Sequence, residues 1–287
     1  MSRASGRAAN SRGEVEEAGG TAAEAAAGGT AAEAATSAEL MAVELARRLR
    51  DDDVAVMGTA SALPQIACRL AQQTHAPDLW FVAGGTCGVN PHLAPAVASC
   101  CDEDLLRADT AVPLSDVVLL EGRGDVFTVF FSGGLQIDAH GNCNLVSVGD
   151  RAHPSLRGPG TVGLPFLARV GRVLIYTMAH NPRTFVERVD FLGGPGFLDG
   201  PSSWAQADLP GGGPAAVVTP LCTFDFDPQT LRMRLETVHP GVTVQQVVQA
   251  TGFELAVPEA VPVTPAPTAD ELAILRSIDS AELLKGR

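Results

Sequence analysis

The chain has 287 residues, of which 46% are hydrophobic and only 18% are charged, and its formal net charge is −13. A nucleic-acid-binding surface needs clustered basic residues that release counterions. No such cluster occurs here, which excludes a nucleic-acid binder and indicates a globular chain with a large core. The low charge also suggests that a partner covers part of the surface, because charged residues are depleted at interface cores.

The cysteines and the hydropathy pattern bear on the compartment. Six cysteines form neither a Cys-x-x-Cys motif nor a Cys/His zinc spacing, and the adjacent Cys100 and Cys101 are unusual for a structural disulfide. A reducing, cytoplasmic compartment fits best. No apolar run reaches the roughly 18 residues of a spanning helix, and the N-terminal region lacks the apolar centre of a signal peptide. We therefore expect no membrane association, and the scattered histidines predict no metal site.

Residues 1–37 differ from the rest of the chain. They consist mainly of Ala, Gly, Glu, Ser and Arg, and residues 19–26 nearly repeat at 28–35. A segment with so little apolar surface to bury is predicted to be disordered. Residues 38–287 contain no comparable break and are expected to form one domain.

Helices and strands are expected to alternate in the first half of this domain. Ser37 and Glu39 form a capping signature before the apolar periodicity of residues 40–49, which predicts a helix. The next expected elements are a strand at 54–59, a helix at 63–74 with Cys68 on its apolar face, and a strand at 79–83. This alternation predicts an open, mostly parallel α/β sheet with helices on both faces, whose strand ends face the ligand.

The second half is expected to add strands and a small antiparallel C-terminal part. Its glycine- and proline-rich stretch at 193–214 is predicted to be loop, and the five prolines at 258–267 predict an extended connector. The remaining expected elements are a helix at 114–120, strands at 126–131, 172–178, 186–191, 215–219, 223–227 and 232–238, and helices at 244–251 and 269–278.

The most informative stretch is GGLQIDAHGNCN at residues 133–144, which follows the strand at 126–131. A glycine pair at a strand end frees the backbone to adopt positive φ and lets a ligand approach closely. Gln136 is expected either to hold the loop or to touch the substrate. Asp138 and Asn142 are expected to fix the turn, with His140 as a solvated side chain. Taken alone, the stretch also fits a β-hairpin with a glycine bulge.

With its spacing, however, the stretch strongly resembles the β subunit of the family I CoA transferases of the glutaconate CoA-transferase type. Other family motifs follow in order: APD at 76–78, SVGD at 147–150, HP at 153–154, GPGFLDG at 194–200, VHPGVT at 238–243 and ATGFEL at 250–255. The resemblance covers about residues 39–284. It implies the CoA-transferase fold, an acyl-CoA thioester as substrate without a bound cofactor, and a homologous α-type subunit as partner. It also implies that the amides of Gly133 and Gly134 help to hold the reacting carbonyl oxygen.

One residue of the family pattern is missing. Members that transfer CoA use a glutamate after the strand that follows Ala-Pro-Asp, and this nucleophile carries CoA as an enzyme thioester. Here Ala83 or Gly84 takes that place, and no carboxylate lies between Asp78 and Asp102. Family relatives have become hydrolases and decarboxylases, and residues 239–243 and 267–279 resemble the β chain of a hydrolase of bacterial steroid-ring degradation.

The expected activity is therefore hydrolysis or C–C cleavage of an acyl-CoA in steroid or carboxylic-acid catabolism. Genuine CoA transfer and a non-catalytic, stabilising subunit are the alternatives.

Five residues after the second strand are the remaining candidates: Gly84, Gly85, Thr86, Cys87 and Asn90. Cys87 is either a nucleophile or base with a lowered pKa or a small buried thiol, and a decarboxylating relative depends on a cysteine in this region. The glycines are expected to approach the substrate. Thr86 and Asn90 either donate hydrogen bonds to it or fix the loop.

Three further side chains stay ambiguous. Arg123 binds a phosphate or carboxylate, or forms a surface salt bridge. His153 and His180 are of a residue type suited to acid–base chemistry, and neither is assigned a role from the sequence.

Overall fold

A computed structural model describes residues 34–92 and 95–285, so most of the predicted disordered extension lies outside the described residues. Helix α1 (Ser37–Ala46) opens the described domain. Its N-cap is Thr36 and not Ser37, because the glutamate of a capping box lies three positions after the cap. The Thr36 hydroxyl accepts from the Glu39 amide at 3.1 Å, and the Glu39 carboxylate accepts from the Thr36 amide at 2.8 Å.

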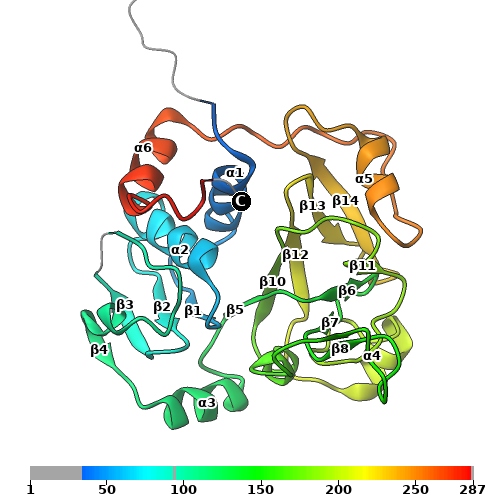
Figure 1. The fold of residues 1–287 in the computed structure, drawn as a ribbon, viewed down its shortest axis with the longest axis horizontal. Helices are drawn as coiled ribbons and strands as arrows, with labels where there is room; N and C mark the ends of the chain where they lie inside the picture. The colour runs from blue at the N-terminus through cyan, green and yellow to red at the C-terminus, as the bar shows by residue number, and fades with distance from the viewer. Residues whose placement is uncertain (1–33, 93–94, 286–287) are drawn as a thin grey trace, which may run out of the picture. The chain divides into compact units, whose positions relative to one another are not determined.

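Nine strands of the described chain form the main sheet in the order β14-β13-β12-β10-β5-β1-β2-β3-β4 (Figure 1). The five central strands run parallel: β12 (Pro214–Val218), β10 (Arg172–Tyr176), β5 (Val129–Ser132), β1 (Val54–Met57) and β2 (Trp80–Ala83). The antiparallel flanks are β13 (Cys222–Phe226) with β14 (Met233–Val238), and β3 (Gly88–Pro91) with β4 (Ala108–Ala111). The expected mostly parallel sheet with an antiparallel C-terminal part is confirmed, whereas β3 and β4 were not predicted.

Helices cover both faces of the sheet. α1, α2 (Ala62–Thr74) and α6 (Ala269–Ile278) pack side by side on one face (Figure 1, blue, cyan and red). α3 (Leu114–Arg123) and the 3₁₀ helix η2 (Leu164–Ala168) lie on the other. Side chains of β1 alternate between these cores, as the period of a strand requires: Ala55 and Met57 join the first core, and Val56 joins the second.

The remaining elements are short. They are η1 (Glu103–Leu106), β6 (Gln136–Asp138), β7 (Cys143–Asn144), β8 (Ser147–Val148), β9 (Leu156–Arg157), β11 (Phe185–Val186), α4 (Pro201–Ala207) and α5 (Val244–Ala250). The predicted strand at 186–191 is wrong beyond β11, because the chain turns there and Asp190 accepts hydrogen bonds from Gln136 and Gly149. The predicted loop at 193–214 contains α4, which begins at Pro201, a residue pre-organised for a first helical turn.

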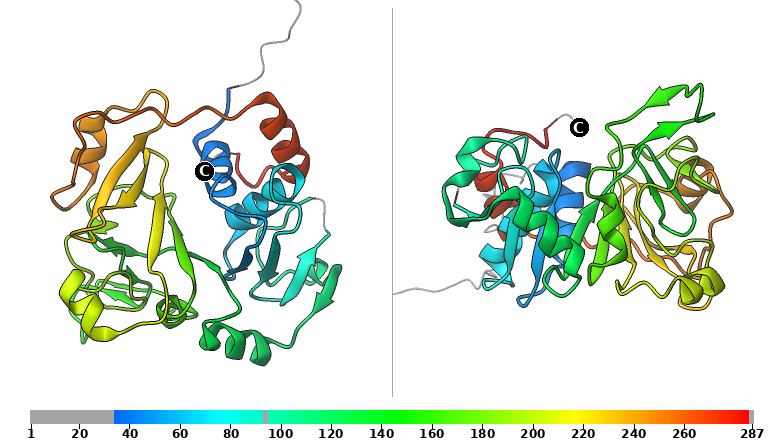
Figure 2. Two further views of the ribbon diagram at one scale, coloured as in Figure 1. Left: turned by 180° about the vertical axis from the view of Figure 1, so that it is seen from behind. Right: turned by 90° about the horizontal axis from the view of Figure 1, so that it is seen from below.

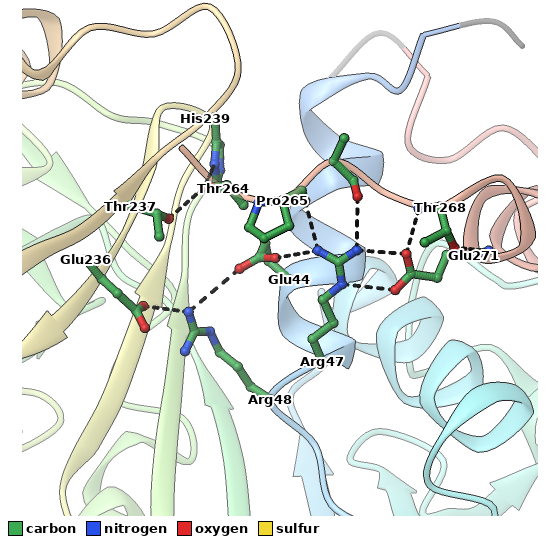
Figure 3. Close-up of polar contacts among 11 residues, drawn as sticks. Glu44, Arg47, Arg48, Glu236, Thr237, His239, Thr264, Pro265, Thr268 and Glu271 are labelled. Atoms are coloured by element: carbon green, nitrogen blue, oxygen red, sulfur yellow. Dashed lines mark hydrogen bonds and ion pairs between the residues drawn. The ribbon is translucent and has the colours of Figure 1, made fainter. Parts of the chain in front are cut away.

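The predicted connector at 258–267 links α5 to α6 without regular structure, as both views show (Figures 1 and 2). Arg47, the C-cap residue directly after α1, binds the end of this connector (Figure 3). The guanidinium donates to the carbonyl oxygens of Pro265 and Ala266 at 2.9 and 3.1 Å. It also donates to both carboxylate oxygens of Glu271 at 2.9 and 2.8 Å, so α1, the connector and α6 share one hydrogen-bonded cluster.

Candidate active site

The carboxyl ends of four parallel strands meet along one edge of the main sheet. In sheet order these strands are β10, β5, β1 and β2. The Gly133–Gly134 pair follows β5, and residues 84–87 follow β2, with only β1 between them. Because ligands of open α/β sheets bind at the carboxyl ends of strands, the structure brings the two predicted site segments together in the expected place.

Close backbone packing explains the glycine pair. A Cβ on Gly133 would lie 2.9 Å from the Tyr176 carbonyl oxygen, and one on Gly134 would lie 2.5 Å from the Gln136 carbonyl oxygen. Neither glycine adopts the positive φ that the sequence permitted. Within the described chain, neither amide donates a backbone hydrogen bond outside the strand ladders. Both N–H groups are thus not committed to such a backbone acceptor.

The rest of the motif is buried and holds itself together. Gln136 donates to the Asp190 carboxylate at 2.9 Å and accepts from the Asn144 amide group at 2.7 Å. The Asp138 carboxylate accepts from the backbone amide of Asn142 at 3.1 Å and from its side chain at 3.0 Å. The Asp138–Asn142 contacts agree with a turn-fixing role for these two residues. The side chain of Gln136 holds the loop through its contacts with Asp190 and Asn144.

The turn after β2 has no room for the family's glutamate. Ala83 is 0% exposed, and its methyl group belongs to the core under α1 and α2. A Cβ on Gly84 would lie 2.1 Å from the carbonyl oxygen of Met57, which already accepts a hydrogen bond from the Gly84 amide at 2.9 Å. A side chain at position 84 would therefore require β1 and β2 to separate.

A second segment packs on the same turn. The Thr86 amide donates to the Cys100 carbonyl at 2.8 Å, and a Cβ on Gly85 would lie 2.5 Å from the Cys101 sulfur. The exposed Cys101 thiol thus lies against the turn, 3.8 Å from the Thr59 hydroxyl just beyond β1. Sequence reasoning did not select Cys101, because only the fold brings this loop to the strand ends. In the sequence, only the adjacency of Cys100 and Cys101 drew attention to this segment.

The predicted candidates in the turn differ in character. Cys87 is 1% exposed, and burial, with the nearby Glu121 and Cys101, raises the pKa of its thiol, so the thiol stays protonated at neutral pH. The Thr86 hydroxyl oxygen is buried and has no hydrogen-bond partner in the described chain. Asn90 instead holds β3 against β2, since its side-chain oxygen accepts from the Phe81 amide at 3.0 Å.

Glu121 is a buried carboxyl group that sequence reasoning missed. It lies on the inner face of α3 and is 7% exposed, and no other described residue forms a hydrogen bond or ion pair with its carboxylate. Burial raises the pKa of Glu121 to about 7. Helical periodicity could have placed it on the buried face with Val117, four residues earlier, but only the structure shows that it lacks a partner.

The histidines are structural or lie at the surface. His180 sits between the hydroxyls of Thr219 and Thr251, at 2.9 and 3.2 Å, and burial, with a contribution from His239, lowers its pKa to about 4. His239 lies 2.8 Å from the Thr219 carbonyl oxygen and 2.9 Å from the Thr264 hydroxyl. Its contact with Thr264, drawn in Figure 3, anchors the connector.

The remaining ambiguous residues lie away from the strand ends. His140 is half-buried rather than solvated, and its Nδ1 lies 2.9 Å from the Leu231 carbonyl oxygen. His153 is exposed. Arg123 pairs with Asp125 at 2.7 Å on the surface, which agrees with the salt-bridge alternative. Among the described residues, no group of His, Cys, Asp and Glu could hold a metal ion, and no helix is long and apolar enough to span a membrane.

The chain is an α/β protein in which the glycine turns after β5 and β2 lie at the same edge of a mostly parallel sheet. The chain belongs to the Coenzyme A transferase family, whose model matches residues 38–250. It is an enzyme chain of that family, of the β type.

Two relatives and one solved structure illustrate the range of the family. The B-type subunit of the 3-oxoadipate CoA-transferase of Pseudomonas knackmussii is 34% identical over 84% of this chain and 92% of its own. The cholesterol ring-cleaving hydrolase IpdB subunit of Mycobacterium tuberculosis is 30% identical over 88% of this chain and 98% of its own. The glutaconate coenzyme A-transferase structure from Acidaminococcus fermentans matches with a TM-score of 0.77 at 29% identity, covering 86% of this chain and 96% of that one. The chain is thus homologous both to transferase subunits and to a hydrolase subunit.

Proposed function

We propose that this chain, with a homologous α-type subunit, acts on an acyl-CoA thioester by hydrolysis or C–C cleavage rather than by CoA transfer. The observation that carries the proposal is the packing of Gly84 on the Met57 carbonyl, which leaves no space for the nucleophilic glutamate. Without a carboxylate there, this chain cannot form the mixed anhydride and enzyme–CoA thioester on which transfer depends. The relatives are themselves subunits of larger enzymes, which supports the α-type partner, as does the low charge of the chain.

The rest of the site suits a thioester substrate without a resident cofactor. The amides of Gly133 and Gly134 act as donors to the carbonyl oxygen as negative charge develops on it. Gly84 and Gly85 let β1 and the Cys100–Cys101 segment pack closely on the turn and so shape its surface toward the substrate, and the unpartnered Thr86 hydroxyl donates to the substrate. The well-bonded side chains of Asn90 and Gln136 contribute by holding the two turns in position.

Similarity to the ring-cleaving hydrolase subunit supports a role in steroid or carboxylic-acid catabolism. The six free thiols support a cytoplasmic location. CoA transfer is the second candidate, favoured by the higher identity to a transferase subunit. It would require the nucleophile to come from the α-type subunit or from an unexpected position in this chain.

Borohydride trapping separates the two mechanisms. The co-expressed complex is incubated with a panel of short dicarboxylyl-CoA and steroid-derived acyl-CoA thioesters, then treated with borohydride, and both chains are analysed by mass spectrometry. We expect substrate consumption without a reduced glutamate on either chain. A reduced glutamate would establish CoA transfer and identify the nucleophile.

A further inference from the structure

The thiols at the turn after β2 are not explained by the proposed function. Three cysteines gather around Gly85: Cys87 two residues later in the chain, and Cys100 and Cys101 packed on it from the loop before η1. Cys100 is fully buried and Cys87 nearly so, whereas Cys101 is the exposed member. An exposed thiol at the carboxyl edge of a parallel sheet is placed to meet a ligand.

One unpartnered group in this turn indicates that something binds here. The Thr86 hydroxyl oxygen is buried without a hydrogen-bond partner in the described chain, although a buried polar atom normally has one. A substrate with polar atoms at this edge would satisfy the Thr86 hydroxyl directly.

The distances across the edge suit an attack by sulfur. Neighbouring strands lie about 4.8 Å apart, so the end of β5, with Gly133, is roughly 10 Å from the end of β2. Cys101 leans from β2 toward β1, since its sulfur lies 3.8 Å from the Thr59 hydroxyl. A thioester carbonyl between an attacking sulfur and an amide donor spans about 6–7 Å, taking ~3–3.5 Å for the attack and ~3 Å for the hydrogen bond.

We propose that Cys101 is the nucleophile that receives the acyl group, in place of the glutamate that position 84 cannot hold. This inference rests on the proposed function and specifies it as thioester hydrolysis. The Cys101 sulfur bonds to the acyl carbon while the Gly133 and Gly134 amides hold the carbonyl oxygen. The bond from that carbon to the CoA sulfur breaks, and the CoA sulfur takes the proton that Cys101 loses.

Hydrolysis of the acyl-cysteine completes the cycle. Water adds to the acyl carbon, the bond from that carbon to the Cys101 sulfur breaks, and a proton from the water returns to the sulfur. The products are one carboxylic acid and one free CoA for each thioester and water consumed. No oxidant, reductant or acceptor acid is needed, unlike in CoA transfer, where a second carboxylate must take the CoA.

The test compares the wild-type αβ complex with Cys101→Ala and Cys101→Ser, and with Ser99→Ala as a matched loop control. The Ser99 hydroxyl accepts from the Cys101 amide at 3.1 Å, so its removal loosens the loop but keeps the thiol. Release of CoA from the acyl-CoA panel is measured, and acid-quenched samples are searched by mass spectrometry for an acyl group on the Cys101 peptide.

We expect Cys101→Ala to slow CoA release at least about 100-fold, with Ser99→Ala within about fivefold of wild type. The Cys101 adduct should form and decay no more slowly than turnover. A Cys101→Ala complex within twofold of wild type, with no kinetically competent adduct, would overturn the inference and leave the proposed function standing. A wild-type complex that consumes no acyl-CoA would overturn both.

Discussion

Arg47 holds the C-terminal connector to the body of the domain, and its replacement by methionine should measure that contribution. Methionine keeps much of the aliphatic stem but removes five hydrogen bonds: two to Glu271, one to Glu44, and one each to the carbonyl oxygens of Pro265 and Ala266. The Arg47 side chain is 27% exposed, and Glu44 is 8% exposed.

The expected loss follows from these contacts. A hydrogen bond to a charged group contributes roughly 1.5–3 kcal/mol when buried, and exposed ion pairs contribute far less. Because the cluster is half-buried and its members are coupled, we expect Arg47→Met to lower the free energy of unfolding by about 3 kcal/mol, not by the sum of five bonds. The carboxylate of Glu44 is also left with less compensation for its burial.

Urea denaturation followed by circular dichroism measures this change as a shift in the midpoint at constant slope. Arg107→Met is the matched control, because Arg107 is 75% exposed and makes one ion pair at 3.4 Å. The control should change stability by less than about 0.5 kcal/mol. An Arg47→Met shift no larger than that of the control would refute the idea that this cluster anchors the connector.

Two further predictions concern the strand-end turn and the buried carboxyl near it. Gly84→Glu restores the residue type of the family. Its Cβ would lie 2.1 Å from the Met57 carbonyl oxygen, so we expect it to destabilise the chain by more than about 3 kcal/mol and to give no borohydride-reducible glutamate. A stable variant that carries a reduced glutamate would contradict this. Burial raises the pKa of Glu121 to about 7 from a usual 4.5. The folded state therefore binds the proton more tightly than the unfolded state, and this stabilisation is complete below pH 4.5 and is lost as the pH rises through 7. Glu121→Gln should then be more stable than wild type at pH 8 by up to about 3 kcal/mol and nearly equal to it at pH 4.5. Thermal unfolding at both pH values measures this, and an equal difference at the two would refute it.

Local patterns in the sequence determined most of the regular elements. The apolar periodicities located α2, α5 and α6 to within a residue at each end, with α6 matching the predicted 269–278 in full. The alternation of helix and strand indicated the parallel sheet, because a crossover connection between parallel strands requires an intervening segment. The short strands β3, β4 and β11 were not predicted correctly, because they form only by pairing with other strands and their own residues carry little strand preference.

The sequence by itself also located the glycine pair and the absence of a carboxylate in the turn after β2, since both are properties of residue identity and order. Only the tertiary structure decided why that carboxylate cannot be present, because the obstacle is the Met57 carbonyl on a neighbouring strand. It alone placed the Cys101 thiol on Gly85, 16 residues away in the chain. It alone left Glu121 buried without a partner. The distances between segments remote in sequence depend on the order in which the strands pair and on how the connecting loops pack against them, and local sequence patterns do not determine either.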